Sequence, residues 1–251
     1  TPRTLGPHTW TRHIGIRKLG AGIDLLNRRE PMIMITGHIG NWEVMGSVLA
    51  SLGYDLDALA RPIDNPLVDR WLMGIRQRRG MRIITKFDAT DRMVRVLDDG
   101  GALAFIADQN AGDKGLFVPF FNRLASCYKS IGLLALNKRV PIVCGCGQRL
   151  PGSLKFEVDL TDVIRPEEWE AHDDPLFYIT ARYSRALENM IRRHPEQYLW
   201  AHRRWKSRPR FERLGKPMPE ALRKNLLSLP WIDEADVERL AEPAPIDDRK
   251  A

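Results

Sequence analysis

The chain alternates between short apolar runs and stretches with apolar residues at helical spacing. Apolar runs that end at a glycine or a polar residue predict buried strands at 31–36, 54–60, 81–85, 101–107 and 140–145, and an alternating run predicts another at 154–160. Apolar positions three and four residues apart predict helices at 41–51, 66–79, 90–98, 130–138 and 175–193. Strands separated by helices predict a single α/β domain, with a mostly parallel central sheet and helices on both faces. In such a sheet, functional residues collect just beyond the C-terminal ends of the strands.

The apolar pattern weakens beyond Pro209. The prolines that follow are Pro217, Pro219, Pro230, Pro243 and Pro245, and acidic residues are scattered among them. We therefore expect one domain at 1–210 and a weakly structured acidic tail at 211–251.

The composition is that of an ordinary globular protein, with 251 residues, 43% of them hydrophobic and 28% charged. This balance excludes a wholly disordered or collagen-like chain. The chain has three cysteines, an odd number, and two of them, Cys144 and Cys146, lie in an apolar run. Both observations favour a protein from a reducing compartment over a secreted protein held by disulfides. No apolar window approaches the ~18 residues of a membrane span. The chain begins at Thr1 rather than Met, which is typical of a fragment.

Positive charge is concentrated in the C-terminal third. The formal net charge is +7, yet the segment from Arg182 to Lys224 alone holds 13 basic and 4 acidic residues. Aromatic residues are interspersed in it, which favours an anionic partner: nucleic acid, anionic lipid or an acidic carrier protein. A solvated helix face with excess arginine is the alternative.

The motif GHIGNWE at 37–43 follows the first predicted strand. Glycines near His38 allow a sharp turn that leaves its imidazole accessible. If the chain folds back, the carboxylate of Glu43 can accept one imidazole N–H and leave the other nitrogen free as a base. Asp108, which ends the strand predicted at 101–107, is an alternative carboxylate partner. A turn histidine followed by a glutamate at a helix N-terminus would give the same spacing without catalysis.

Four blocks of the sequence, taken in order, resemble the lipid A late acyltransferases, the lauroyl and myristoyl transferase branch of the HX4D/E glycerolipid-type acyltransferases. The blocks are GHIGNWE at 37–43, RPIDNPL at 61–67 with Arg76 downstream, DQ at 108–109 followed by GLFVPFF at 115–121, and PEQYLWAHRRWK at 195–206. HX4E alone is a weak signal, whereas four blocks in the same order are specific. The resemblance covers about residues 10–210.

The resemblance implies an O-acyltransferase that moves a fatty acyl chain from an acyl carrier protein thioester to a hydroxyl of a lipid A precursor. It places this reaction at the cytoplasmic face of the bacterial inner membrane, without metal or cofactor, and implies an N-terminal membrane anchor that is missing from this chain. His38 and Glu43 would be catalytic, with Glu43 orienting His38. Substrate would be bound by Arg61, Asn65, Arg76, Asp108, Arg203 and Arg204.

The sequence departs from the family pattern at two places, and the second leaves the acyl chain length open. Asn122 stands where the family usually carries glycine, and residues 128–130 (YKS) occupy a stretch that is usually small and Thr-rich. The acceptor could also be another membrane lipid: a phosphoinositol mannoside, an ornithine lipid or a lysophospholipid. A nucleic-acid-binding protein is the alternative from a different class. We expect no nucleic-acid partner, because no such motif is present and the aromatic residues do not recur at platform spacing.

Overall fold

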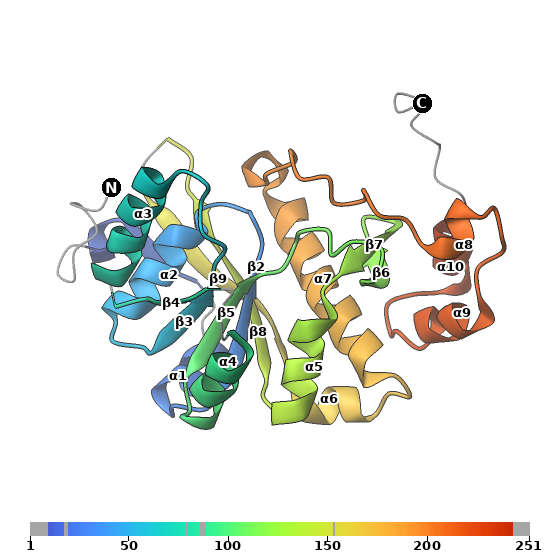
Figure 1. Cartoon of the computed structure of the whole chain (residues 1–251), viewed down its shortest axis with the longest axis horizontal. Helices are drawn as coiled ribbons and strands as arrows, with labels where there is room; N and C mark the ends of the chain where they lie inside the picture. The colour runs from blue at the N-terminus through green and yellow to red at the C-terminus, as the bar shows by residue number, and fades with distance from the viewer. Residues whose placement is uncertain (1–9, 18–19, 79, 86–88, 153, 243–251) are drawn as a thin grey trace.

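The computed structural model describes residues 10–17, 20–78, 80–85, 89–152 and 154–242 (Figure 1). Seven strands form one sheet in the order β1-β9-β8-β2-β5-β3-β4, in which β8 and β9 are antiparallel and the other neighbours are parallel. These strands are β1 (Ile14–Ile16), β2 (Met32–Thr36), β3 (Leu56–Leu59), β4 (Arg82–Ile84), β5 (Ala102–Ile106), β8 (Ile142–Arg149) and β9 (Phe156–Ile164). The predicted α/β fold with a mostly parallel sheet is confirmed.

Helices cover both faces of the sheet, with α2 and α3 on one side and α5 and α7 on the other (Figure 1). The helices up to α7 are α1 (Gly20–Asn27), α2 (Trp42–Ser51), α3 (Pro66–Arg78), α4 (Ala89–Asp98), α5 (Lys129–Lys138), α6 (Pro166–Glu170) and α7 (Pro175–Arg193). The central strand β2 explains the arrangement, because Ile33 and Ile35 enter the core beneath α7 whereas Met32 and Met34 enter the core beneath α2. A strand buried on both faces has the continuous apolar run that the sequence shows. Within the described ranges, no helix is both long and apolar enough to cross a bilayer.

The apolar stretch at 116–121 is half of a hairpin that the sequence did not predict. Strand β6 (Leu116–Phe120) pairs antiparallel with β7 (Arg123–Cys127). Phe121 and Asn122 form the turn between them with φ of 51° and 56°. The sequence signal for such a turn is usually Asn-Gly, so the Phe-Asn pair did not indicate a turn here. Asn122, which departs from the family's glycine, thus occupies a left-handed position that asparagine tolerates.

Residues 211–242, expected to be weakly structured, instead form short helices that pack on the main core. Helices α8 (Arg210–Arg213), α9 (Glu220–Leu227) and α10 (Glu234–Ala241) follow one another between the prolines. Leu226, Val237 and Leu240 are buried in the same core as α7. The Asp233 side chain caps α10 by accepting from the Asp236 backbone N–H at 2.8 Å. A few well-placed leucines are thus enough to order a segment rich in prolines and charge, and residues 243–251 lie outside the described range.

Candidate active site

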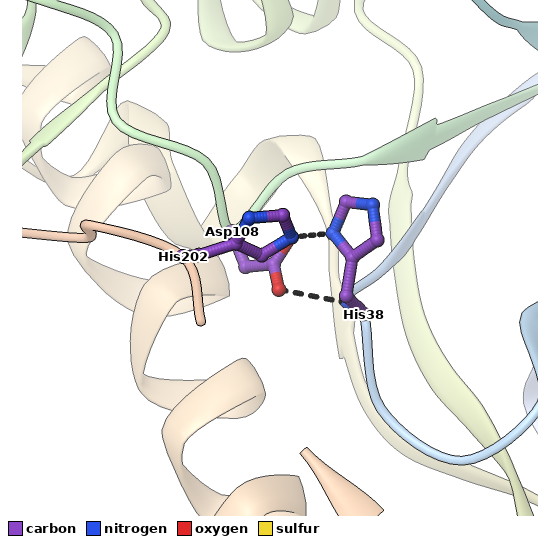
Figure 2. A group of neighbouring side chains, drawn as sticks. All are labelled: His38, Asp108 and His202. Carbon is purple, nitrogen blue, oxygen red and sulfur yellow. Dashed lines mark hydrogen bonds and ion pairs between the residues drawn. The ribbon is translucent and has the colours of Figure 1, made fainter. Parts of the chain in front are cut away.

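The carboxylate that contacts His38 belongs to Asp108. His38 Nδ1 lies 2.7 Å from Asp108 Oδ1, and the His38 backbone N–H donates to Asp108 Oδ2 at 2.8 Å (Figure 2). The Asp108 side chain is fully buried, whereas that of His38 is 15% exposed. Because a carboxylate only accepts hydrogen bonds, Nδ1 carries a proton and Nε2 keeps a lone pair that can take a proton from a substrate.

The parallel pairing of β2 and β5 brings this pair together. Thr36 is opposite Ile106 in the register, and the Ala107 N–H donates to the Thr36 carbonyl at 2.9 Å. Two residues beyond that register, His38 and Asp108 emerge side by side at the C-terminal edge of the sheet. Functional residues typically gather at this edge.

The loop that carries His38 is fixed by two other segments. The His38 carbonyl accepts from the Leu199 N–H at 2.9 Å, and the Gly40 N–H donates to the Gln197 carbonyl at 3.0 Å. Gly40 has φ of +59°, and a Cβ there would lie 2.1 Å from the Gly147 carbonyl oxygen on β8. Only glycine fits this position. The block at 195–200 therefore serves to hold the His38 loop in place.

Glu43 contacts Arg76 rather than His38. Arg76 Nε lies 3.2 and 3.0 Å from the two Glu43 carboxylate oxygens, and Arg76 Nη2 also donates to Oε1. No hydrogen bond or ion pair joins Glu43 to His38 among the residues that the structure describes. The orienting contact expected from Glu43 is therefore made by Asp108. Glu43, in the first turn of α2, is bound instead by a guanidinium from α3.

An apolar cavity of about 80 Å³ lies beside the Glu43–Arg76 pair, between α2, α3 and the sheet. Its apolar walls include Met34, Met45, Leu49, Leu56, Met81, Phe105 and Leu160. Trp42 lines the cavity and also contacts the His38 ring, with 5.0 Å between the ring centroids. The Thr36 side chain lines it too, and its Oγ1 is buried without a hydrogen-bond partner among the described residues. The cavity thus combines apolar walls with a few polar groups near His38, as small-molecule sites commonly do.

His202 is a site residue that the sequence interpretation missed. Its ring packs edge-on against that of His38, with 4.3 Å between the centroids. Burial lowers the pKa of His202, the nearby charge of His38 lowers it further, and the Asp108 carboxylate opposes both. His202 is therefore uncharged near neutral pH. The signal was present in the block at 195–206, but the sequence interpretation singles out only the adjacent Arg203 and Arg204 as substrate residues.

Asp108 is ionised despite its burial. Burial alone would raise the pKa of Asp108, but the hydrogen bonds from the ring and backbone N–H of His38, together with the positive charges that His38 and His202 carry once they are protonated at low pH, outweigh it. The pKa of Asp108 is consequently below its ordinary value. A fixed negative charge beside Nδ1 stabilises the imidazolium that forms when Nε2 takes a proton.

The same cluster has the composition of a metal site. Among the described residues, His38, Asp108 and His202 each offer a ligand atom, and these atoms all lie within 4.8 Å of one another. Two imidazoles and a carboxylate suit Zn²⁺. A metal at His38 Nδ1 would have to replace the proton that this nitrogen shares with Asp108.

Arg204, predicted to bind substrate, is instead a structural residue. It is only 2% exposed, and its guanidinium donates to the carbonyls of Gln109, at 3.3 Å, and Ser126, and to Cys127 Sγ at 2.7 Å. These contacts tie the loop after β5 to strand β7. A side chain in this environment is not free to bind an anionic surface.

The other predicted substrate residues lie at the surface near α3 and the site. Arg61 and Arg203 are exposed. Asn65 caps α3, because its Oδ1 accepts from the N–H groups of Leu67, at 3.0 Å, and Val68, at 3.3 Å. Asn65, predicted to bind substrate, therefore also stabilises the N-terminus of α3.

Much of the positive charge between Arg182 and Lys224 is neutralised within the fold. Ion pairs join Arg182 to Asp162 and Glu168, Arg192 to Glu188, Arg193 to Asp159, Arg208 to Glu212, Arg223 to Glu234 and Glu238, and Lys224 to Asp173. Arg203, Lys206 and Arg210 are exposed and have no carboxylate partner among the described residues. The cationic surface is therefore smaller than the sequence suggests.

Comparison with known proteins identifies the family. The family model for bacterial lipid A biosynthesis acyltransferases matches residues 8–207. The chain is 25% identical to a lipid A biosynthesis lauroyltransferase and 29% identical to a palmitoleoyltransferase, both of Escherichia coli (strain K12), over 80% and 75% of its length. It is 28% identical over 73% of its length to a lipid A biosynthesis acyltransferase of Haemophilus influenzae. It spans 58–63% of the length of these relatives. The chain belongs to the family of bacterial lipid A biosynthesis acyltransferases.

Proposed function

We propose that this chain is an O-acyltransferase that transfers a fatty acyl group from an acyl carrier protein thioester to a hydroxyl of a lipid A precursor. The proposal places the reaction at the cytoplasmic face of the inner membrane. The observation that carries it is the His38–Asp108 pair at 2.7 Å beside an apolar cavity. The names of the relatives, which specify lauroyl and palmitoleoyl groups, support a fatty acyl donor.

The chemistry follows from the free nitrogen of His38. Nε2 takes the proton of the acceptor hydroxyl while that oxygen attacks the thioester carbonyl carbon. The resulting tetrahedral species collapses, the C–S bond breaks, and the thiolate leaves and takes up the proton from His38. Asp108 holds the imidazole in the required tautomer and stabilises its charged form. The ester product and the free carrier thiol account for every atom, without an acyl-enzyme.

The Glu43–Arg76 pair and the cavity suit the acyl donor. The cavity offers apolar walls to the part of a fatty chain nearest the thioester, and Trp42 extends these walls to the His38 ring. Arg76 lines the same cavity and its side chain is 15% exposed. A guanidinium held there by Glu43 can stabilise negative charge on the attacked carbonyl oxygen.

The acidic acyl carrier protein would meet a small cationic surface formed by Arg203, Lys206 and Arg210. These side chains are exposed, and all three lie within eight residues after His202 in the chain. Attraction between such a surface and an acidic partner steers their encounter and is screened by salt. We therefore place the carrier on this side of the site.

Acyl transfer by purified protein tests the proposal. Lauroyl-acyl carrier protein and a lipid A precursor are incubated with the chain, and the product is identified by mass spectrometry. His38→Ala should lower the rate by on the order of 10²–10⁴. His172→Ala is the matched control, because His172 is another half-buried histidine but stacks on Tyr178, near the beginning of α7, and not on His38. Equal rates in wild type and His38→Ala would overturn the mechanism, and no acylated product with any carrier thioester would overturn the function.

A further inference from the structure

Helix α3 exposes a cluster of large apolar side chains to solvent. Leu67 is 72% exposed, Trp71 64% and Val68 44%, and Ile63, just before the helix, is 40% exposed. We call these four residues the α3 apolar face. The three helical positions lie within an arc of about 100°. Scattered apolar residues are ordinary on a protein surface, but a cluster of this size usually marks an interaction site.

The α3 apolar face lies at the same edge of the sheet as His38. Strands β2, β5 and β3 are parallel neighbours, so the loops that follow β2 and β3 leave the sheet at one edge. The first of these loops carries His38 and the second leads into α3 (Figure 1). A membrane that contacts the beginning of α3 would therefore face the edge of the sheet at which His38 lies.

The two sides of α3 have different environments. Arg76, about 140° around the helix from Trp71, turns inward to Glu43 and the apolar cavity. Trp71 and Leu67 are exposed and do not line that cavity. One side of the helix thus closes the cavity, while the opposite side is apolar and has no partner among the described residues.

We propose that the α3 apolar face inserts into the head-group region of an anionic lipid bilayer. Trp is the side chain most typical of that region, where its ring is partly buried and its N–H stays hydrated. Arg61 and Arg70 are exposed beside the cluster and can pair with head-group phosphates, while the exposed Asp64 offsets part of their charge. The inference rests on the proposed function for the nature of the acceptor: docking here turns the sheet edge that carries His38 toward the surface at which a membrane glycolipid presents its hydroxyl groups.

Vesicle flotation tests the docking face. The purified chain is mixed with vesicles of phosphatidylethanolamine and phosphatidylglycerol, and bound protein is measured against lipid concentration. The double variant Leu67→Ser/Trp71→Ser should bind at least about tenfold more weakly, since two large apolar side chains no longer enter the lipid. Leu133→Ser and Leu214→Ser are the controls, because these leucines are 51% and 53% exposed elsewhere. Brominated lipids should quench Trp fluorescence in wild type and much less in Trp71→Phe.

The outcomes separate this inference from the proposed function. Equal vesicle binding by the double variant and the controls, at unchanged melting temperature, would overturn the docking face. So would a dimer in sedimentation equilibrium that the double variant disperses while vesicle binding persists, since the face would then pair two copies of the chain. Acyl transfer measured in detergent micelles, where docking is not needed, tests the chemistry alone. Absent transfer with face-dependent vesicle binding would refute the function and leave the docking face standing.

Discussion

Replacing Asp108 with asparagine should separate the catalytic histidine from its partner without changing the shape of the site. Asp108 makes two contacts with His38, one to the ring Nδ1 at 2.7 Å and one to the backbone N–H at 2.8 Å. An amide can satisfy only one of them correctly. If its oxygen accepts from the backbone N–H, its NH₂ group faces Nδ1, and the ring proton must move to Nε2. If the amide is reversed, its NH₂ group opposes the backbone N–H donor.

The first arrangement removes the base, because the lone pair needed at Nε2 is replaced by a proton. It also removes the negative charge that stabilises the imidazolium. Both effects act on the general-base step, so we expect the rate of acyl transfer to fall by on the order of 10²–10⁴. The fold should lose about 1–3 kcal/mol at neutral pH, the usual cost of disturbing a buried hydrogen bond. Because the folded pKa of Asp108 is lowered, this stabilisation is present above the ordinary carboxyl pKa of about 3.9 and is lost as the pH falls through the lowered value.

Steady-state transfer rates and melting temperatures, both measured from pH 5 to 9, are the assay. Asp159→Asn is the matched control, because Asp159 is also buried, at 3% exposed, but pairs with Arg193 at 2.7 Å and not with His38. Asp159→Asn should lower the melting temperature and leave the transfer rate of the folded protein nearly intact. A folded Asp108→Asn protein with the wild-type rate and pH profile would remove Asp108 from the mechanism.

Three further variants probe the neighbours of this pair. Glu43→Gln loses the charge that holds Arg76, so kcat/KM should fall about tenfold or more, with an unshifted pH profile; a shifted profile would show that Glu43 acts on His38 directly. The pKa of His202 is lower in the folded protein than in the unfolded chain, so protonation of His202 favours unfolding as the pH drops through about 6.5. His202→Gln should therefore lose less stability than the wild type over this range, which melting curves between pH 5 and 8 measure. Arg204→Met should cost about 1–3 kcal/mol for each carbonyl that it orphans, whereas Arg203→Met, at an exposed position, should leave the denaturation midpoint nearly unchanged.

Local patterns predicted most of the elements, because each depends on the burial of a short segment. The amphipathic helix expected at 175–193 is α7, with the same bounds, and the apolar run at 31–36 is β2. The predictions failed where burial depends on a distant partner. Strand β7 is ordered by pairing with β6 across a turn without glycine, and Leu226 and Val237 are ordered by a core that the first part of the chain builds.

The same difference between local and distant contacts explains why the sequence predicted His38 as a site residue but left its carboxylate partner open. A histidine just after a buried strand is a local feature, and the motif at 37–43 shows it. The choice between Glu43 and Asp108 depends on which strand lies beside β2. Proximity in sequence favours Glu43. However, Asn41 caps α2 just before Glu43, and Glu43, in the first turn of this helix, pairs with Arg76. Asp108 is 70 residues from His38, but β5 is the parallel neighbour of β2, and its register places the two side chains opposite each other. Strand order is a property of the whole sheet, so the partner of a strand-end histidine is best sought among carboxylates that end other strands, however distant in the chain.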